Sequence, residues 1–183
     1  MERTQHGGRL VDSGVALISQ SSNIVINMSM QARGLPIAYI ACVGNQAQTS
    51  LTEMTSTLLD DDRVTAAGLY IEGIVNTADF ASMATATRSA GKYIVAIKSG
   101  KTAASQDAAS SHTAALAGDA AASSAFLRQC GVIEVNTPDE MLETLKLLHM
   151  FGPLAGNKIS AMCCSGGETG MIADLSANMA LDW

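Results

Sequence analysis

The sequence has little charge, few aromatic residues and no long apolar run, and each shortage excludes a class of protein. Charged residues make up 15% of the 183 positions and apolar residues 48%. A disordered chain has the opposite balance. The composition also argues against a nucleic-acid binder, because the net charge is −6 and aromatic residues reach only 4%. No apolar run approaches the roughly 20 residues that span a bilayer, and the first ten residues lack the apolar core of a signal peptide. We therefore expect a cytoplasmic, globular protein.

Cysteine is also scarce, with four residues. We expect Cys42 and Cys130 to be buried. Cys163 and Cys164 are adjacent at the end of an apolar run, and neighbours in a strand point to opposite faces, so they would make a poor disulfide or metal pair. The pattern predicts reduced, structural cysteines and no metal site in this chain.

What the sequence does contain is an alternation of apolar runs with helical patterns. The runs are continuous, which is typical of parallel strands covered on both faces. They span residues 14–19, 35–43, 66–72, 92–98 and 131–135. Helices are predicted over 50–61 and 77–91, each with a Ser or Thr cap.

The clearest predicted helix covers residues 137–151. Thr137 is the expected cap, Pro138 occupies the first turn and Glu140 completes a capping box. Its apolar stripe consists of Met141, Leu142, Leu145 and Leu148.

This order predicts an α/β fold with a doubly wound parallel sheet of flavodoxin-like type within residues 1–150. A linker (151–157), a strand (158–164), a glycine turn (165–170) and a helix (171–180) follow. We expect residues 151–183 to be the linker and the first βα unit of a second, similar domain. One such unit cannot bury its own apolar face, so we expect a fragment of a longer polypeptide.

Three segments could bind an anion. The turns at residues 21–23 and 166–167 each lie between an apolar run and a predicted helix, and helix starts bind anions; an ordinary cap and a tight turn are the simpler interpretations. His112 lies among small residues in "DAASSHTAALAGDAA", although a lone histidine is usually structural. Glu72 ends a predicted central strand, at the edge where such sheets bind ligands, or is a solvated turn residue.

Five motifs occur in the order found in one family: "VALISQSS", "CVGNQA", "LYIEGI", "SHTAALAG" and "GNKISAMCCSGGETGMIAD". Together they resemble the NDP-forming acyl-CoA synthetases, the superfamily of succinyl-CoA synthetase, over nearly the whole chain after residue 13. "SHTAALAG", similar to the phosphohistidine loop of the family, is the specific motif.

The resemblance implies a succinyl-CoA synthetase-like fold and the reversible synthesis of acyl-CoA from a carboxylic acid, CoA and NTP. An acyl phosphate forms first, and a histidine then carries the phosphoryl group to a distant nucleotide site. By position, His112 would be that carrier and Glu72 would accept a hydrogen bond from its ring. The implied phosphate-binding residues are Ser21, Ser22, Asn23, Gly166, Gly167 and Thr169.

The same resemblance implies that the substrates are CoA, ATP or ADP, and phosphate, with no tightly bound cofactor in this chain. The implied partners are a CoA-binding Rossmann domain and an ATP-grasp domain that holds Mg, in cis or as a subunit. Nucleic acid and membranes are not expected as partners, and homo-oligomerisation is left open. We expect the chain alone to lack the complete activity.

Three residues depart from the family pattern. Ser22 and Ala114 replace glycines, and Glu168 brings an acid to the start of the second predicted helix, where it would repel phosphate unless it points away. These changes are compatible with an outlying branch such as the feruloyl-CoA synthetase-like members. Two alternatives remain: a catalytically degenerate member acting as a regulatory or interaction subunit, and a flavodoxin-like binder of another phosphorylated ligand such as FMN.

Overall fold

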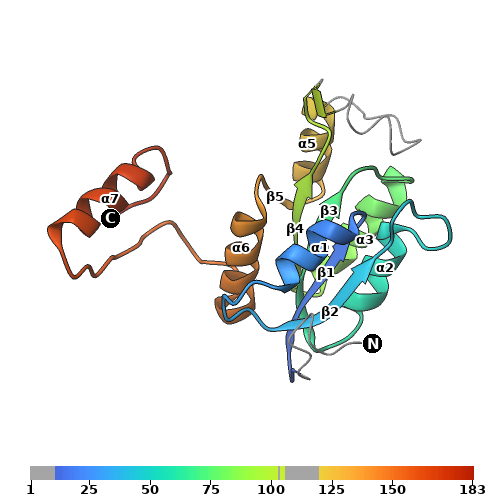
Figure 1. Cartoon of the computed structure of the whole chain (residues 1–183), viewed down its shortest axis with the longest axis horizontal. Helices are drawn as coiled ribbons and strands as arrows, with labels where there is room; N and C mark the ends of the chain where they lie inside the picture. Colours follow the sequence, from blue (N-terminus) through green and yellow to red (C-terminus); the bar gives the residue numbers. More distant parts are fainter. Residues whose placement is uncertain (1–10, 103, 106–119) are drawn as a thin grey trace. The chain divides into compact units, whose positions relative to one another are not determined.

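The computed structural model describes residues 11–102, 104–105 and 120–183, and the chain divides into two compact units (Figure 1). The first unit ends at Met150 and the second comprises Phe151–Trp183.

The first unit is built on a five-stranded sheet in the order β2-β1-β3-β4-β5. All of its strand pairs are parallel, and this is the strand order of flavodoxin. The predicted flavodoxin-like fold is therefore confirmed, and all five predicted strands are present with small shifts at their ends. The strands are β1 (Gly14–Ser19), β2 (Ile37–Cys42), β3 (Val64–Ile71), β4 (Tyr93–Lys98) and β5 (Ile133–Val135).

Helices cover both faces of this sheet (Figure 1). One layer contains α1 (Ser22–Ser29) and α6 (Pro138–Phe151), and the other contains α2 (Leu51–Leu59), α3 (Thr77–Ser89) and α5 (Ala120–Gln129).

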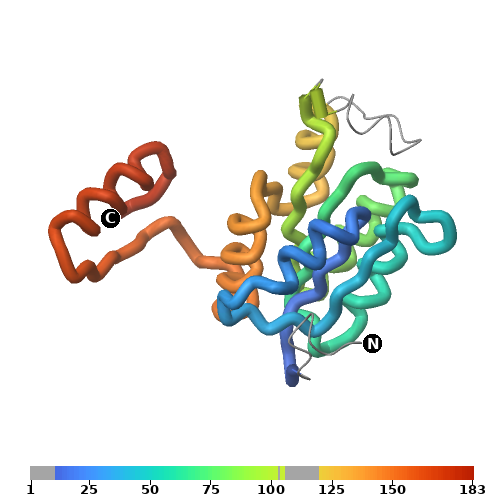
Figure 2. Tube along the Cα trace, in the orientation of Figure 1, coloured from blue at the N-terminus to red at the C-terminus, as the bar shows by residue number. Residues whose placement is uncertain are grey.

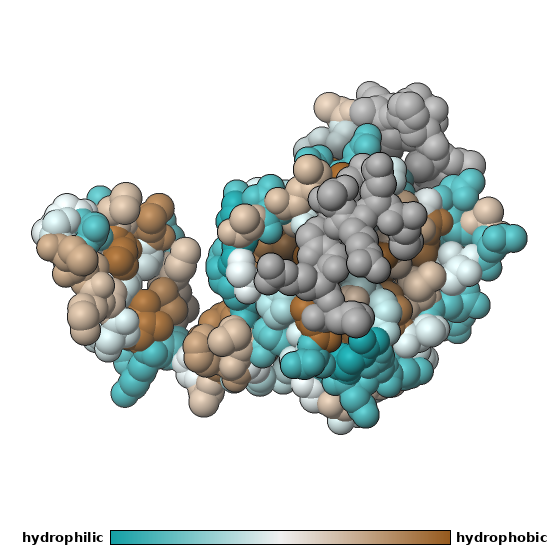
Figure 3. Space-filling model, turned by 60° about the horizontal axis from the view of Figure 1, so that its bottom comes forward, coloured by the Kyte–Doolittle hydropathy of each residue, from teal (hydrophilic) through white to brown (hydrophobic). Residues whose placement is uncertain are grey.

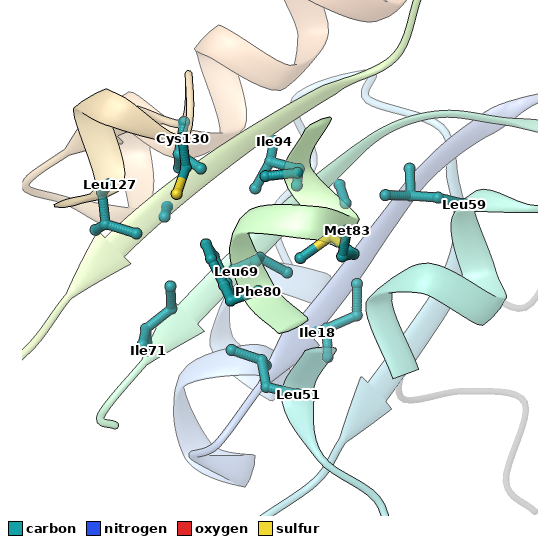
Figure 4. Packing of buried hydrophobic residues seen from close by; sticks show 14 of the residues in the cluster. Ile18, Leu51, Leu59, Leu69, Ile71, Phe80, Met83, Ile94, Leu127 and Cys130 are labelled. Atoms are coloured by element: carbon teal, nitrogen blue, oxygen red, sulfur yellow. The ribbon is translucent and has the colours of Figure 1, made fainter. Parts of the chain in front are cut away.

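Strand β1 shows why its apolar run is continuous. Val15 and Leu17 belong to the cluster under α1 and α6, whereas Ala16 and Ile18 belong to the cluster under α2, α3 and α5. Successive side chains of a strand point to opposite faces, so a strand covered on both sides needs apolar residues at every position. Figure 4 shows this second cluster, with α3 lying across the strands.

Side chains fix the starts of several helices. Ser50 and Glu53 form a capping box at α2, and the predicted box of Thr137 and Glu140 is present at α6. The predicted Ser or Thr cap of α3 is wrong. Asn76 caps it instead, because its backbone is extended and its side-chain oxygen accepts from the amides of Ala78 and Asp79.

The second unit differs from the prediction. The expected strand over 158–164 is absent, because the unit supplies no neighbouring strand; Lys158 forms only an isolated bridge with Asp182. The predicted helix starts earlier, as α7 (Gly166–Ser176), because Ser165 and Glu168 form a capping box inside the expected glycine turn. Figure 2 traces the extended segment leading into α7.

All four cysteines are free. Cys130 is buried as predicted, but Cys42 is exposed, because it ends β2, which is an edge strand of the sheet. Cys163 is half-buried and Cys164 exposed, and they lie outside any strand.

Apolar side chains are exposed on the second unit (Figure 3). A hollow of about 430 Å³ lies within this unit and is lined by residues that include Cys163, Ile172 and Trp183. The most exposed of the large apolar residues between 160 and 183 are Met162, Met171, Leu175, Met179 and Trp183, each more than half exposed.

Candidate functional site

The candidate site begins at the carboxyl edge of the sheet, where all parallel strands end together. Gln20 directly follows β1, Glu72 directly follows β3, and Lys98 is the last residue of β4. Because β3 lies between β1 and β4, these three residues meet at the centre of the edge.

Glu72 is half-buried, and its backbone is bonded on both sides. Its N–H donates to Gln20 Oε1 at a distance of 2.5 Å, and its carbonyl oxygen accepts from Lys98 Nζ at a distance of 2.9 Å. The structure thus places Glu72 at the end of a central strand, as predicted.

The start of α1 lies beside Glu72, because Gln20, which bonds the Glu72 amide, immediately precedes the cap residue Ser21. Ser21 has an extended backbone, and its side chain makes no capping hydrogen bond. Ser19 Oγ instead accepts from the Ser21 amide and donates to the Ser21 carbonyl. Ser22 and Asn23 are the exposed first residues of the helix, and first-turn amides have no partner within a helix. This start therefore presents amides that the helix itself does not bond, together with the positive end of the helix dipole.

The start of α7 is arranged differently. Glu168 Oε2 accepts from the amides of Cys164 at 2.7 Å and Ser165 at 3.1 Å, so its carboxylate is turned toward the residues before the helix. The Thr169 hydroxyl donates to the Ser165 carbonyl oxygen at 3.2 Å and is used within the helix. Gly166 and Gly167 are the first two residues of α7.

Neither of these glycines is required by the local backbone or packing. Neither Gly166 nor Gly167 has a positive φ. A Cβ at Gly166 would meet nothing within 4 Å, and one at Gly167 would meet only Ser165 Oγ at 3.8 Å.

His112 and Ala114 lie outside the described residues. Before that segment, Lys101 Nζ lies 2.8 Å from Glu134 Oε1 in β5, and Ser124 of α5 donates to the same oxygen. Burial of Glu134 raises the pKa of its carboxyl, but the bonds from Lys101 and Ser124 outweigh this, and the pKa falls below its ordinary value. This bridge ties the segment after β4 to β5 and α5.

Of the predicted site residues, the structure brings Glu72 and Ser21, Ser22 and Asn23 to one edge, and Gly166, Gly167 and Thr169 belong to the second unit. The sequence analysis missed two further residues of this edge, Gln20 and Lys98, each only 8% exposed. A lysine ending the otherwise apolar run 93–97 was the available signal.

The described part of the chain contains no group of three or more His, Cys, Asp or Glu side chains arranged to hold a metal ion. In the same residues, no helix has the length and apolar character needed to cross a membrane.

Comparisons with known proteins find one family model, the succinyl-CoA ligase-like flavodoxin domain, which matches residues 12–148. A trans-feruloyl-CoA synthase from an unknown prokaryotic organism is 28% identical over 182 residues, covering 100% of this chain and 26% of that protein. The alpha subunit of ADP-forming acetate–CoA ligase II from Pyrococcus furiosus is 33% identical, covering 87% of this chain and 35% of the subunit.

Among solved structures, the dinucleotide-forming acetyl-coenzyme A synthetase 1 of Candidatus Korarchaeum cryptofilum, in complex with phosphate and ADP, superposes with a TM-score of 0.81. It is 25% identical, and the match covers 93% of this chain and 37% of that one. The chain therefore spans only about a quarter to just over a third of the length of these relatives.

Proposed function

This chain belongs to the family of succinyl-CoA ligase-like flavodoxin domains, and we propose that it is the part of an NDP-forming acyl-CoA synthetase in which a histidine receives a phosphoryl group. The observation that carries the proposal is the position of Glu72, directly after central strand β3 and one hydrogen bond from the residue that leads into α1. Glu72 and the start of α1 are thus neighbours on one edge, which supports the proposal that this helix start binds the phosphoryl group.

In this proposal the neutral imidazole of His112 attacks the phosphorus of an acyl phosphate. The P–N bond forms, the bond between phosphorus and the acyl oxygen breaks, and the free carboxylate leaves with the electron pair. The ring becomes positively charged, and its remaining N–H donates to the Glu72 carboxylate, which fixes the tautomer and stabilises the charge.

Within each unit, the proposed donors to phosphoryl oxygens lie at a helix start. At α1 the donors are the amides of Ser22 and Asn23, with the hydroxyl of Ser21, which makes no capping hydrogen bond, beside them. At α7 they are the amides of Gly166 and Gly167. The Thr169 hydroxyl is bonded within α7, so it would contribute to a phosphate only by changing its acceptor.

The other steps of the reaction need further protein. We propose a CoA-binding Rossmann domain and an ATP-grasp domain that holds Mg and the nucleotide, in cis or as a subunit, with this chain alone lacking complete activity. Two observations support the proposal of further domains. The chain covers only 26% and 35% of the length of two relatives, and the second unit exposes apolar surface.

One observation favours the alternative, a degenerate member that acts as a regulatory or interaction subunit. The Glu168 carboxylate brings a negative charge to the start of α7, and its capping bonds keep it there. A charge of this sign opposes anion binding at a helix start.

The test offers radiolabelled acetyl phosphate to the chain, because every residue proposed for this step is within it. We expect an acid-labile, alkali-stable label that is absent in His112→Ala. In Glu72→Gln the rate of labelling should fall about tenfold or more. The matched control is His149→Asn, which keeps a partner for the Thr65 hydroxyl that bonds His149 Nδ1 at 2.8 Å, and it should label at the normal rate.

An unlabelled wild-type chain, or a label that persists in His112→Ala, would contradict the proposal. Glu168→Gln separates the alternative: if a wild-type chain without label gains one when this charge is removed, the degenerate member is the correct description.

A further inference from the structure

The backbone of Glu72 is held by two buried polar side chains that the family resemblance did not assign. A glutamate that orients an imidazole is useful only if its Cα is fixed, and Glu72 lies just beyond the last residue of β3, where the strand ladder no longer holds it. Its backbone groups must therefore find other partners.

Gln20 bonds the Glu72 amide and both backbone groups of Gly73. Its Oε1 accepts from the amides of Glu72 and Gly73, at 2.5 and 3.0 Å, and its Nε2 donates to the Gly73 carbonyl at 3.0 Å. One side chain thus satisfies three backbone groups of two consecutive residues, as a neighbouring strand would. A second glutamine, Gln46, also donates to the Gly73 carbonyl, at 3.3 Å, while its Oε1 accepts from the Leu51 amide at the start of α2.

Lys98 bonds Glu72 from the other side. Its Nζ donates to the carbonyls of Glu72, at 2.9 Å, and of Ser99, at 2.5 Å. The residue is only 8% exposed, and a lysine is seldom buried to this extent unless it is paired. A methionine would fill the same space at the end of β4 without that cost, so the buried ammonium indicates a specific use.

We propose that Gln20 and Lys98 are positioning residues that clamp the Glu72 peptide from β1 and β4, so that its carboxylate meets the histidine ring in a fixed geometry. The clamp rests on the proposed function of Glu72, because it acts through that residue. It requires the edge to be built from three strands at once, with β3 central.

The experiment combines amide hydrogen exchange with the acetyl phosphate labelling rate in Gln20→Met and Lys98→Met. In Gln20→Met we expect the Glu72 and Gly73 amides to lose protection while the amides within β3 keep theirs. Labelling of His112 should slow about 10- to 100-fold. The control is Gln31→Met, at an exposed glutamine of the same unit, and it should change neither readout.

A double variant separates positioning from a general structural role. If Gln20 acts through Glu72, then Gln20→Met in the Glu72→Gln background causes little further loss of rate, because the orienting carboxylate is already gone. Gln20→Glu retains an acceptor for both amides and should restore their protection. Should Gln20→Met fail to fold, Lys98→Met and the same double variant built on it test the clamp.

Normal labelling in Gln20→Met and Lys98→Met, or losses that multiply with that of Glu72→Gln, would overturn the clamp while leaving the phosphohistidine intact. A wild-type chain that never labels at His112 overturns both the proposed function and the clamp that rests on it.

Discussion

Helix α6 packs so closely on β3 that a single methyl group at Gly68 should be felt. A Cβ at this position would lie 2.7 Å from Leu145 Cδ1 and 3.0 Å from Met141 Sδ, and both side chains are fully buried. These atoms are the ends of side chains, which can shift by small rotations. Overpacking of a core costs about 1–3 kcal/mol, and Gly→Ala regains about 0.4–1 kcal/mol from the unfolded state. We expect Gly68→Ala to destabilise the first unit by about 1 kcal/mol.

Gly14→Ala should cost more, about 2 kcal/mol or above. There a Cβ would lie 2.6 Å from the Pro36 carbonyl oxygen and 3.0 Å from the Ala38 amide nitrogen. These are backbone atoms of β2 and of the residue just before it, and the same Pro36 oxygen accepts from the Val15 amide. Relief of the clash therefore requires breaking hydrogen bonds between the two strands. Gly156→Ala is the control, because nothing lies within 4 Å of its Cβ position, and it should stay within about 0.5 kcal/mol of wild type.

Urea unfolding followed by far-ultraviolet circular dichroism measures these costs. For a chain of this length each kcal/mol shifts the midpoint of thermal unfolding by about 2–4 °C. Leu145→Ala alone should cost about 2–5 kcal/mol, and its combination with Gly68→Ala should cost at least about 0.5 kcal/mol less than the sum, because the new methyl group occupies the space vacated. Strict additivity, or equal costs for Gly68→Ala and Gly14→Ala, would refute the reasoning.

Two further predictions concern the first unit. Hydrogen bonds from Arg63 and Tyr39 hold the pKa of the Asp61 carboxyl well below its ordinary value of 3.8, so this carboxylate stabilises the fold above its unfolded pKa, and the contribution is lost as the pH falls through the folded pKa. Asp61→Asn should therefore lower the unfolding temperature at pH 7, and the difference from wild type should shrink steadily below about pH 4. An undiminished difference at pH 3, or the same loss in Asp60→Asn at the exposed neighbouring residue, would count against this prediction. Removal of the α6 cap in Thr137→Ala should cost about 1 kcal/mol in urea unfolding, against about 0.2 kcal/mol for Thr137→Ser, and equal costs would show that the hydroxyl does not cap.

Local patterns were enough to predict the five strands of the sheet and the starts of α2, α3 and α6. A parallel strand covered on both faces needs apolar residues at every position, and the run Gly14–Ser19 is readable in one sequence for that reason. The capping boxes at α2 and α6 involve residues three apart, so their chemistry is likewise local. The strand expected at 158–164 failed because a strand exists only with a neighbour, and the second unit supplies none.

The sequence by itself determined the doubly wound fold and placed Glu72 at a strand end, because both follow from the periodicity of side chains and from segment order. Only the tertiary structure decided what holds that glutamate. Gln20 and Lys98 are 52 and 26 positions away from it, and they meet it because β3 lies between β1 and β4 in the sheet. Hydrogen bonds over such separations depend on strand order and register, which no local pattern of residue types encodes.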